Sequence, residues 1–251
     1  MREQQQPAFI LHHRGYGETS LLLEAFTPNH GRLGLIAKGA RRQNSRLRGL
    51  LKPFQPLLIG WSGRGELAVL TGAETDAGAP ALAGAALYCG FYLNELLLRL
   101  LHRHDPHEAL FAAYRIALDA LGRGGAHEAA MRVFETRLLR ELGYGPVLDH
   151  DIADKTPIVG AAIYDYIPER GPVRLDPGPN APARGIRIQG ASLLALAGEQ
   201  LESAQALRET KMLMRALLAR QLGDKPLHSR RLFLQGTAAP RAMAVGRERK
   251  A

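Results

Sequence analysis

Residues 19–49 read TSLLLEAFTPNHGRLGLIAKGARRQNSRLRG, and this stretch decides the fold of the N-terminal part of the chain. Two short apolar runs, 19–26 and 32–39, stand on either side of a turn signal that ends in Gly31. Short apolar runs bounded by glycine and proline are typical of β-strands. We therefore expect two neighbouring strands here, followed by a basic loop.

Three further candidate strands surround this pair, at 8–13, 56–61 and 66–73. Five short strands with turn signals between them favour a small closed or nearly closed barrel. An oligonucleotide-binding (OB) barrel has this number of strands, and a five-stranded SH3-like barrel fits almost as well. We predict an N-terminal five-stranded OB-type β-barrel domain over residues 1–78.

From about residue 80 the pattern becomes helical. In 128–142 the apolar residues Met131, Phe134 and Leu138 recur at helical spacing, and 81–102, 108–121 and 203–222 are further helix candidates. We predict an α+β protein in which the barrel is followed by an all-α helical domain, 79–235. A Pro/Gly-rich insertion lies near 146–190, and its segment 168–185 indicates loop or extended chain.

The two chain ends call for separate expectations. The final residues, 236–251, indicate a disordered basic tail. The N-terminus has no apolar run of the signal-peptide kind, which favours a cytoplasmic protein.

The run 77–94 has 18 uncharged residues, but it contains proline and glycines and is short of the roughly 20 strongly apolar residues of a membrane span. A buried helix is the favoured interpretation, and we expect no membrane association.

Charge points to a polyanionic partner. Lys and Arg number 33 against 24 Asp and Glu, a net charge of +9. The excess is segregated: residues 1–75 carry +5, 76–207 carry −4 and 208–251 carry +8. Such a distribution indicates a basic module, an acidic spacer or partner domain and a second basic element, with nucleic acid the commonest partner of such surfaces.

The strongest basic cluster is the segment 32–52, which holds seven basic residues and no acid. Its part 39–49, GARRQNSRLRG, is typical of a mobile cationic loop that contacts phosphates without reading bases. A loop that is merely solvated is the alternative. The candidate DNA contacts of the barrel are Arg14, Tyr16, Arg32, Lys38, Arg41, Arg42, Arg46, Arg48, Lys52 and Arg64, and those of a second patch are Lys225, Arg230 and Arg231.

Three aromatic residues, Tyr16, Phe54 and Trp61, could stack on bases. Strand alternation favours a place in the barrel core for Phe54 and Trp61. Tyr16 lies in a predicted turn and is therefore the better candidate for stacking.

The sequence contains no convincing catalytic or metal motif. Residues 102–107 read HRHDPH, but this order is not that of a metallo-hydrolase and the segment joins two predicted helices. Cys89 is the only cysteine, which excludes a Cys-based zinc site, and we expect it to be a small core residue. Phosphate-binding loops, a nucleophile elbow and clustered carboxylates beside the basic segment are all missing. We therefore expect a binding protein without cofactor or metal, not an enzyme.

Five stretches of the chain resemble the RecO family of bacterial DNA repair proteins. They are RGYGETSLLLEAFTPNHGRLGLIAKGARR (14–42), LLKPFQPLLIGWSGRGELAVLTGAE (50–74), LYCGFYLNELLLRLL (87–101), FETRLLRELGYGP (134–146) and LGDKPLHSRRLF (222–233). The resemblance implies an OB domain followed by a helical domain, in a cytoplasmic, nucleoid-associated protein. It further implies binding of single- and double-stranded DNA, strand annealing, and cooperation with RecR in loading RecA recombinase onto DNA coated by single-strand binding protein (SSB).

Two site expectations follow from the resemblance. Many family members carry a four-cysteine zinc module after the Gly-Tyr-Gly-Pro element, whereas no cysteine follows 143–146 here, so we expect the metal site to be absent. The family also contacts the acidic C-terminal tail of SSB. For that tail we single out three arginines of the 128–142 helix, with pairing to Glu128, Glu135 and Glu141 as the alternative role. These arginines are Arg132, Arg137 and Arg140.

Two other functions stay open from the residues alone. A basic barrel is equally suited to binding and annealing RNA. An adaptor that mainly binds acidic protein tails is the other possibility.

Overall fold

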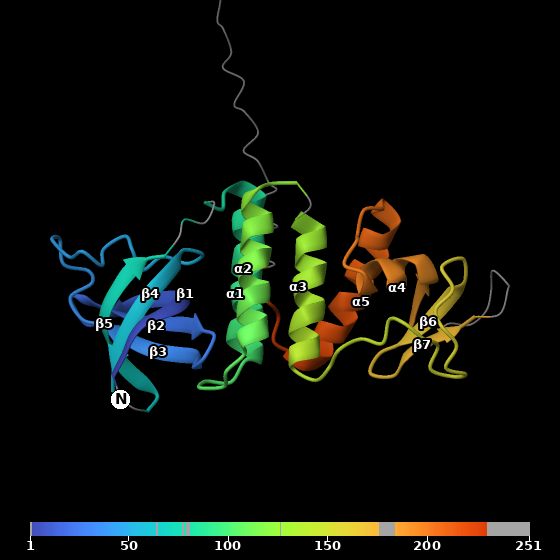
Figure 1. The fold of residues 1–251 in the computed structure, drawn as a ribbon, viewed down its shortest axis with the longest axis horizontal. Helices are drawn as coiled ribbons and strands as arrows, with labels where there is room; N and C mark the ends of the chain where they lie inside the picture. Colours follow the sequence, from blue (N-terminus) through green and yellow to red (C-terminus); the bar gives the residue numbers. More distant parts are fainter. Residues whose placement is uncertain are drawn as a thin grey trace, which may run out of the picture.

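The computed structural model describes residues 2–63, 65–76, 78, 81–125, 127–175 and 184–229. A β-barrel lies at one end of the molecule, helices occupy the middle, and a small sheet lies at the other end (Figure 1). The α+β class, with an N-terminal barrel followed by helices, is therefore confirmed.

Five strands close the barrel in the order β1-β2-β3-β5-β4, and only β3 and β5 pair in parallel. The strands are β1 (Arg2–Tyr16), β2 (Ser20–Thr27), β3 (Gly31–Ala37), β4 (Pro56–Ser62) and β5 (Leu67–Thr75). β1 is much longer than the predicted 8–13 because its first half pairs with β4 and its second half with β2.

The barrel interior is filled by alternating apolar side chains such as Leu23, Leu35 and Ile59. Trp61 belongs to this interior with 5% of its surface exposed, as strand alternation predicted. Phe54 does not: it packs against the helical core, where its ring lies 5.1 Å from that of Phe91. Trp61 is therefore not available to stack on a base, and Phe54 is partly covered by the helical core.

The helices are α1 (Gly84–Leu100), α2 (Glu108–Gly122), α3 (His127–Glu141), α4 (Gly190–Ala197) and α5 (Ala204–Leu222). α1 and α2 overlap in this view, α3 stands beside them, and α5 lies beyond α3 (Figure 1). Cys89 is buried among them, as expected, and this burial raises the pKa of its thiol to about 11. Among the described residues, no helix is both long and apolar enough to cross a bilayer.

The domain that follows the barrel is not all-α, contrary to the sequence-based expectation. β6 (Ile163–Ile167), β7 (Gly171–Arg174) and β8 (Ile186–Gln189) form an antiparallel sheet of order β7-β6-β8 in the segment expected to be an irregular insertion. These strands are only four or five residues long and are separated by proline- and glycine-rich segments, so they carry little periodic signal. The sheet buries Tyr164 and Tyr166 against the helical core. The predicted tail, 236–251, lies outside the described residues.

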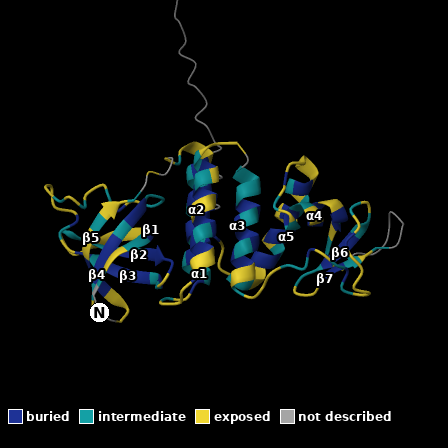
Figure 2. Ribbon diagram, in the orientation of Figure 1, coloured by how far each residue is buried: buried dark blue, intermediate teal, exposed yellow. Residues whose placement is uncertain are grey.

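The barrel is joined to the helices by a packed interface. The rings of Phe9 and Phe26 lie 5.4 and 5.5 Å from that of Phe111 on α2. The Asn94 side chain on α1 donates a hydrogen bond of 2.8 Å to the carbonyl of Leu11. Buried residues accordingly run through the barrel, the helices and the sheet (Figure 2). The barrel surface is thus held in a fixed orientation to the rest of the molecule.

Candidate nucleic-acid interface

The basic segment between β3 and β4 is a chain of tight turns. Backbone amides of Arg42, Ser45 and Arg48 each donate to the carbonyl three residues earlier. Ala40 and Leu51 are buried in the barrel core, at 1% and 3% exposure, and anchor the two ends of the segment. Apolar anchors thus hold the cationic side chains on a defined backbone.

The segment docks on the turn between β1 and β2 through Arg41. Its amide donates to the carbonyl of Thr19 at 2.8 Å, and its guanidinium donates to the carbonyl of Gly17 at 3.2 Å. The guanidinium also lies 3.0 Å from the place where a Cβ on Gly15 would sit. Tyr16 stands between these two glycines, with 50% of its surface exposed. A fixed cation therefore contacts the two glycines that flank an exposed tyrosine, while strand alternation turns the Tyr16 side chain to the opposite face of β1 from Gly15.

Most of the predicted basic barrel contacts lie at the protein surface. Their side chains are exposed, and none of them forms an ion pair with a carboxylate of the described residues. They are Arg14, Lys38, Arg41, Arg42, Arg46, Arg48 and Lys52. An acidic residue, Glu18, lies in the turn that directly follows Tyr16. Because carboxylates do not neutralise these cations, their charge is available to phosphates. Arg64 lies outside the described residues.

One predicted DNA contact has a different role. Arg32 on β3 donates to the carbonyl of Leu98 on α1 and lies 3.7 Å from the carboxylate of Glu24, which also pairs with Arg103. Burial lowers the pKa of Arg32, and the Glu24 charge opposes that effect. Arg32 therefore ties the barrel to α1 and is not part of the exposed basic surface.

Sequence reasoning missed His12, which adds to the exposed surface. His12, Arg14 and Tyr16 alternate along the end of β1 and are all exposed, so they share one face of the strand. The H-x-R-x-Y spacing would have revealed this face if β1 had been extended beyond residue 13.

The second predicted patch is described only in part. Lys225 is exposed, and its backbone carbonyl accepts a 2.7 Å hydrogen bond from Arg99 of α1. Arg230 and Arg231 lie outside the described residues.

The arginines proposed for an acidic tail are mostly engaged within the protein. Arg132 is 5% exposed and pairs with Glu135 at 2.5 Å, which is the alternative that helical spacing offered. Arg137 forms two hydrogen bonds with Glu199, and this pairing raises its pKa. Arg140 alone of the three is exposed. The helix α3 therefore does not present the predicted cationic face.

The described residues do not bring together side chains that could bind a metal ion. No group of three or more His, Cys, Asp or Glu side chains in these residues could hold an ion. Within the 102–107 segment, His107 lies 3.3 Å from Asp105 and 3.1 Å from Glu141, contacts that join the turn after α1 to the end of α3. A zinc module of the kind common in the resembling family therefore does not fit these residues.

Comparison with known proteins covers nearly the whole chain. The model for the N-terminal region of recombination protein O matches residues 1–78, and the model for its C-terminal region matches residues 82–231. A DNA repair protein RecO from Nitrosospira multiformis is 49% identical over 233 residues, 92% of this chain and 95% of the relative. One from Alkalilimnicola ehrlichii is 50% identical over 237 residues, 94% of this chain and 93% of the relative.

A relative from a third organism shows the same similarity. The DNA repair protein RecO of Coxiella burnetii is 47% identical over 228 residues, 91% of this chain and 97% of the relative. Both domains and the sequence between them are thus shared with these relatives. The barrel, the helices and this identity together show that the chain belongs to the recombination protein O (RecO) family of DNA repair proteins.

Proposed function

We propose that this protein is a DNA-binding recombination mediator of the bacterial cytoplasm and nucleoid. It binds single- and double-stranded DNA through the barrel, anneals complementary strands and helps to load RecA recombinase onto SSB-coated DNA. RecR and the C-terminal tail of SSB are its protein partners in this role. Membership of the RecO family supports a place in recombinational repair.

The observation that carries the DNA-binding part is the uncompensated basic surface beside Tyr16. Cations without carboxylate partners lie on turns anchored in the barrel core, next to a half-exposed aromatic ring. Phosphate contacts supply sequence-independent affinity by releasing counterions, and an exposed ring adds base stacking of about 1–3 kcal/mol. This combination suits a protein that binds many DNA sequences.

Annealing follows from the same electrostatics. Two complementary strands repel each other because both are polyanions, and cationic surfaces that neutralise phosphates lower that repulsion. The process requires no bond making or breaking, so we propose that the protein acts without catalysis and without a cofactor.

The test removes four arginines of the basic segment. In Arg41→Ala/Arg42→Ala/Arg46→Ala/Arg48→Ala we expect weaker binding to unrelated single-stranded sequences alike. The slope of log affinity against log salt should fall by about 0.7 for each phosphate that the variant no longer neutralises. Fluorescence anisotropy at several salt concentrations measures both quantities. Arg115→Ala/Arg123→Ala, exposed cations at α2 and its C-terminal end, is the matched control.

An unchanged slope in a folded quadruple variant would show that the basic segment is not the DNA surface. Matched RNA oligomers in the same titration distinguish the RNA-binding alternative, which predicts equal or tighter binding to RNA. Annealing of complementary strands without ATP then tests the mediator function itself.

A further inference from the structure

The end of α3 holds a second tyrosine in a rigid position. The amide of Gly143 donates to the carbonyl of Arg140 at 3.0 Å, and the amide of Tyr144 donates to that of Leu139 at 2.8 Å. With Gly143 in the left-handed region (φ +81°), this is a Schellman motif, which satisfies the last carbonyls of the helix. Tyr144 is nevertheless 56% exposed. Its backbone is fixed while its ring faces solvent.

This site repeats the local chemistry of the barrel turn. Among the described residues, Tyr16 and Tyr144 are the only exposed members of the set Phe, Tyr and Trp, and each stands between two glycines. In each case an arginine packs against a flanking glycine. The guanidinium of Arg41 lies 3.0 Å from a Cβ position on Gly15, and the Cγ of Arg140 lies 2.7 Å from one on Gly145.

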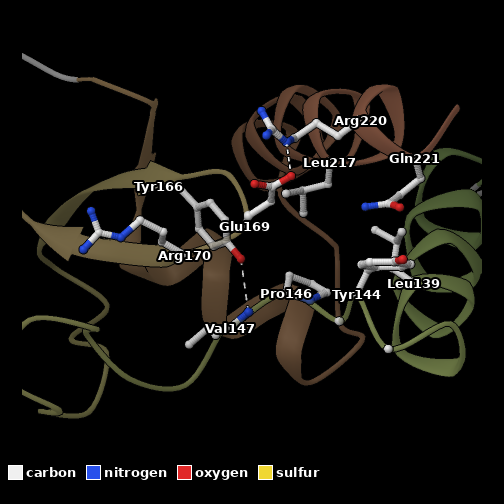
Figure 3. Close-up of a pocket in the computed structure, with 12 residues that line it drawn as sticks. Leu139, Tyr144, Pro146, Val147, Tyr166, Glu169, Arg170, Leu217, Arg220 and Gln221 are labelled. Atoms are coloured by element: carbon white, nitrogen blue, oxygen red, sulfur yellow. Dashed lines mark hydrogen bonds and ion pairs between the residues drawn. The ribbon is translucent and has the colours of Figure 1, made fainter. Parts of the chain in front are cut away.

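Tyr144 lies where two surface hollows meet. One hollow lies between the end of α3, the β6–β7 turn and α5, with Pro146, Tyr166 and Arg220 in its wall (Figure 3). The other, about 570 Å³, extends under the end of α1. Tyr144 and Gln221 line both of them. The larger hollow falls in the size range of small-molecule sites, about 300–1,000 Å³, so it has room for a nucleotide.

Basic residues outnumber acidic ones around this ring. The exposed cations at or beside the hollows are Arg140, Arg170, Arg220 and Lys225, and the acids are Asp105, Glu141 and Glu169. Arg32 and Arg99 also line the larger hollow, but they are held by backbone carbonyls and, for Arg32, by Glu24. The carboxylate of Glu169 pairs with Arg220 at 2.5 Å, but both side chains are at least half exposed. Such an exposed pair is weak and can exchange for a phosphate contact.

We propose that Tyr144 and the cations around it form a second contact for single-stranded nucleic acid. This inference rests on the proposed function and assigns it a second site, at the end of α3 and not on the β1–β2 turn of the barrel. A base stacks on the Tyr144 ring, while phosphates lie over Arg140 and the rims of the hollows. A protein with two such sites can hold two strands at once, which annealing requires. An acidic peptide is the competing occupant, and the experiment includes it.

The experiment counts bound oligonucleotides on the full chain. Native mass spectrometry with an oligothymidine of about five nucleotides, short enough for one site, should find two bound per parent chain and one per Tyr144→Ala chain. Tyr144→Phe keeps the ring and should bind two. Ile116→Ala, which removes an exposed apolar side chain from α2, is the matched control and should also bind two. Affinity for the second oligonucleotide should fall about 5- to 150-fold when the ring is removed.

Other results would overturn the inference. A count of two in Tyr144→Ala shows that the second site lies elsewhere. A parent count of one, abolished in the four-arginine variant, leaves the proposed function standing and removes the second site. A parent count of zero overturns both. If Tyr144→Ala loses binding to an acidic, aromatic-ended peptide while the oligonucleotide count stays at two, the surface is a protein-docking site.

Discussion

Two buried aspartates hold the chain around the small sheet. The Asp151 carboxylate is 2% exposed and accepts the amides of Ala153 at 2.7 Å and Arg174 at 2.6 Å. The Asp165 carboxylate on β6 accepts the amides of Arg184 and Gly185 at 2.7 and 2.8 Å. Hydrogen bonds to an ionised acceptor are stronger than neutral ones. Each carboxylate therefore fixes the path of the segments next to the strands.

Replacing Asp151 tests this role. Asp151→Asn places an amide group against backbone N–H donors, which should cost about 1–3 kcal/mol of the free energy of unfolding because a buried donor loses its partner. Thermal unfolding followed by circular dichroism measures the loss, with the exposed Glu202→Gln as control.

A chelator should leave the melting temperature of the parent unchanged, and a decrease would contradict the metal-free interpretation.

For single residues, the sequence predicts which side chains can pair along a helix better than it predicts whether the pair is buried. Helical spacing correctly offered Glu135 as the partner of Arg132, but it could not show that the pair is buried beside Tyr92, whose hydroxyl donates to the same carboxylate at 2.6 Å. Arg32 looked like its basic neighbours because its partners lie 66 residues away on α1 and on the adjacent strand β2, which only the fold brings beside it. The pattern of charged residues in a sequence does not show contacts that only the fold creates.

At the scale of elements, α1 anchors the segment that follows α5. Arg99 donates to the carbonyls of Leu222 and Lys225 at 2.6 and 2.7 Å. The carboxylate of Glu95 accepts the amides of His228 and Ser229, both at 2.8 Å. Burial alone would raise the pKa of Glu95, but the hydrogen bonds from Ser229 and His228 outweigh it and lower this pKa.

The anchor should therefore depend on pH. A carboxyl whose folded pKa is lowered stabilises the fold above its unfolded pKa, and this stabilisation is lost as pH falls through the lowered value. We expect the amides of His228 and Ser229 to be protected from hydrogen exchange at neutral pH. They should lose protection on acidification below the usual pKa of glutamate, whereas Glu95→Gln should show weak protection at every pH. Equal protection in both proteins would mean that Glu95 does not hold the segment.

Elements with a strong periodic pattern were predictable and short ones were not. The barrel strands and the helices at 84–141 and 204–222 follow the apolar spacing of the sequence. The strands β6 to β8 depend on tertiary packing of Tyr164 and Tyr166, a contribution that no local pattern reveals. The basic segment was found by charge, but its anchors Ala40 and Leu51 were not distinguishable from loop residues.

At the scale of the whole molecule, Gly31 lets the barrel approach the helical domain closely. Its φ is +61°, and a Cβ placed there would lie 1.9 Å from the carbonyl oxygen of Asp105. Gly17 has a similar φ of +58°, but a Cβ there would meet nothing within 4 Å. The two positions therefore share the left-handed backbone and differ in the contact between domains.

This pair separates backbone strain from domain docking. Gly17→Ala should cost only the left-handed penalty of roughly 1–2 kcal/mol. Gly31→Ala should cost more, because the backbone of the 101–107 turn must also move. Calorimetry should show one unfolding transition for the parent and Gly17→Ala, and separate barrel and helical transitions for Gly31→Ala. Equal melting temperatures for the two variants would show that the domains do not depend on this contact.

The close fit at Gly31 also bears on how such chains can be inherited or engineered. A chimaera that joins the barrel of one relative to the helices of another receives its two docking faces from different lineages. Phe9, Phe26 and Gly31 on the barrel must then match Asn94, Phe111, Tyr114 and the 101–107 turn. Barrel and helices should therefore be exchanged as one unit, although they match two separately recognisable sequence regions.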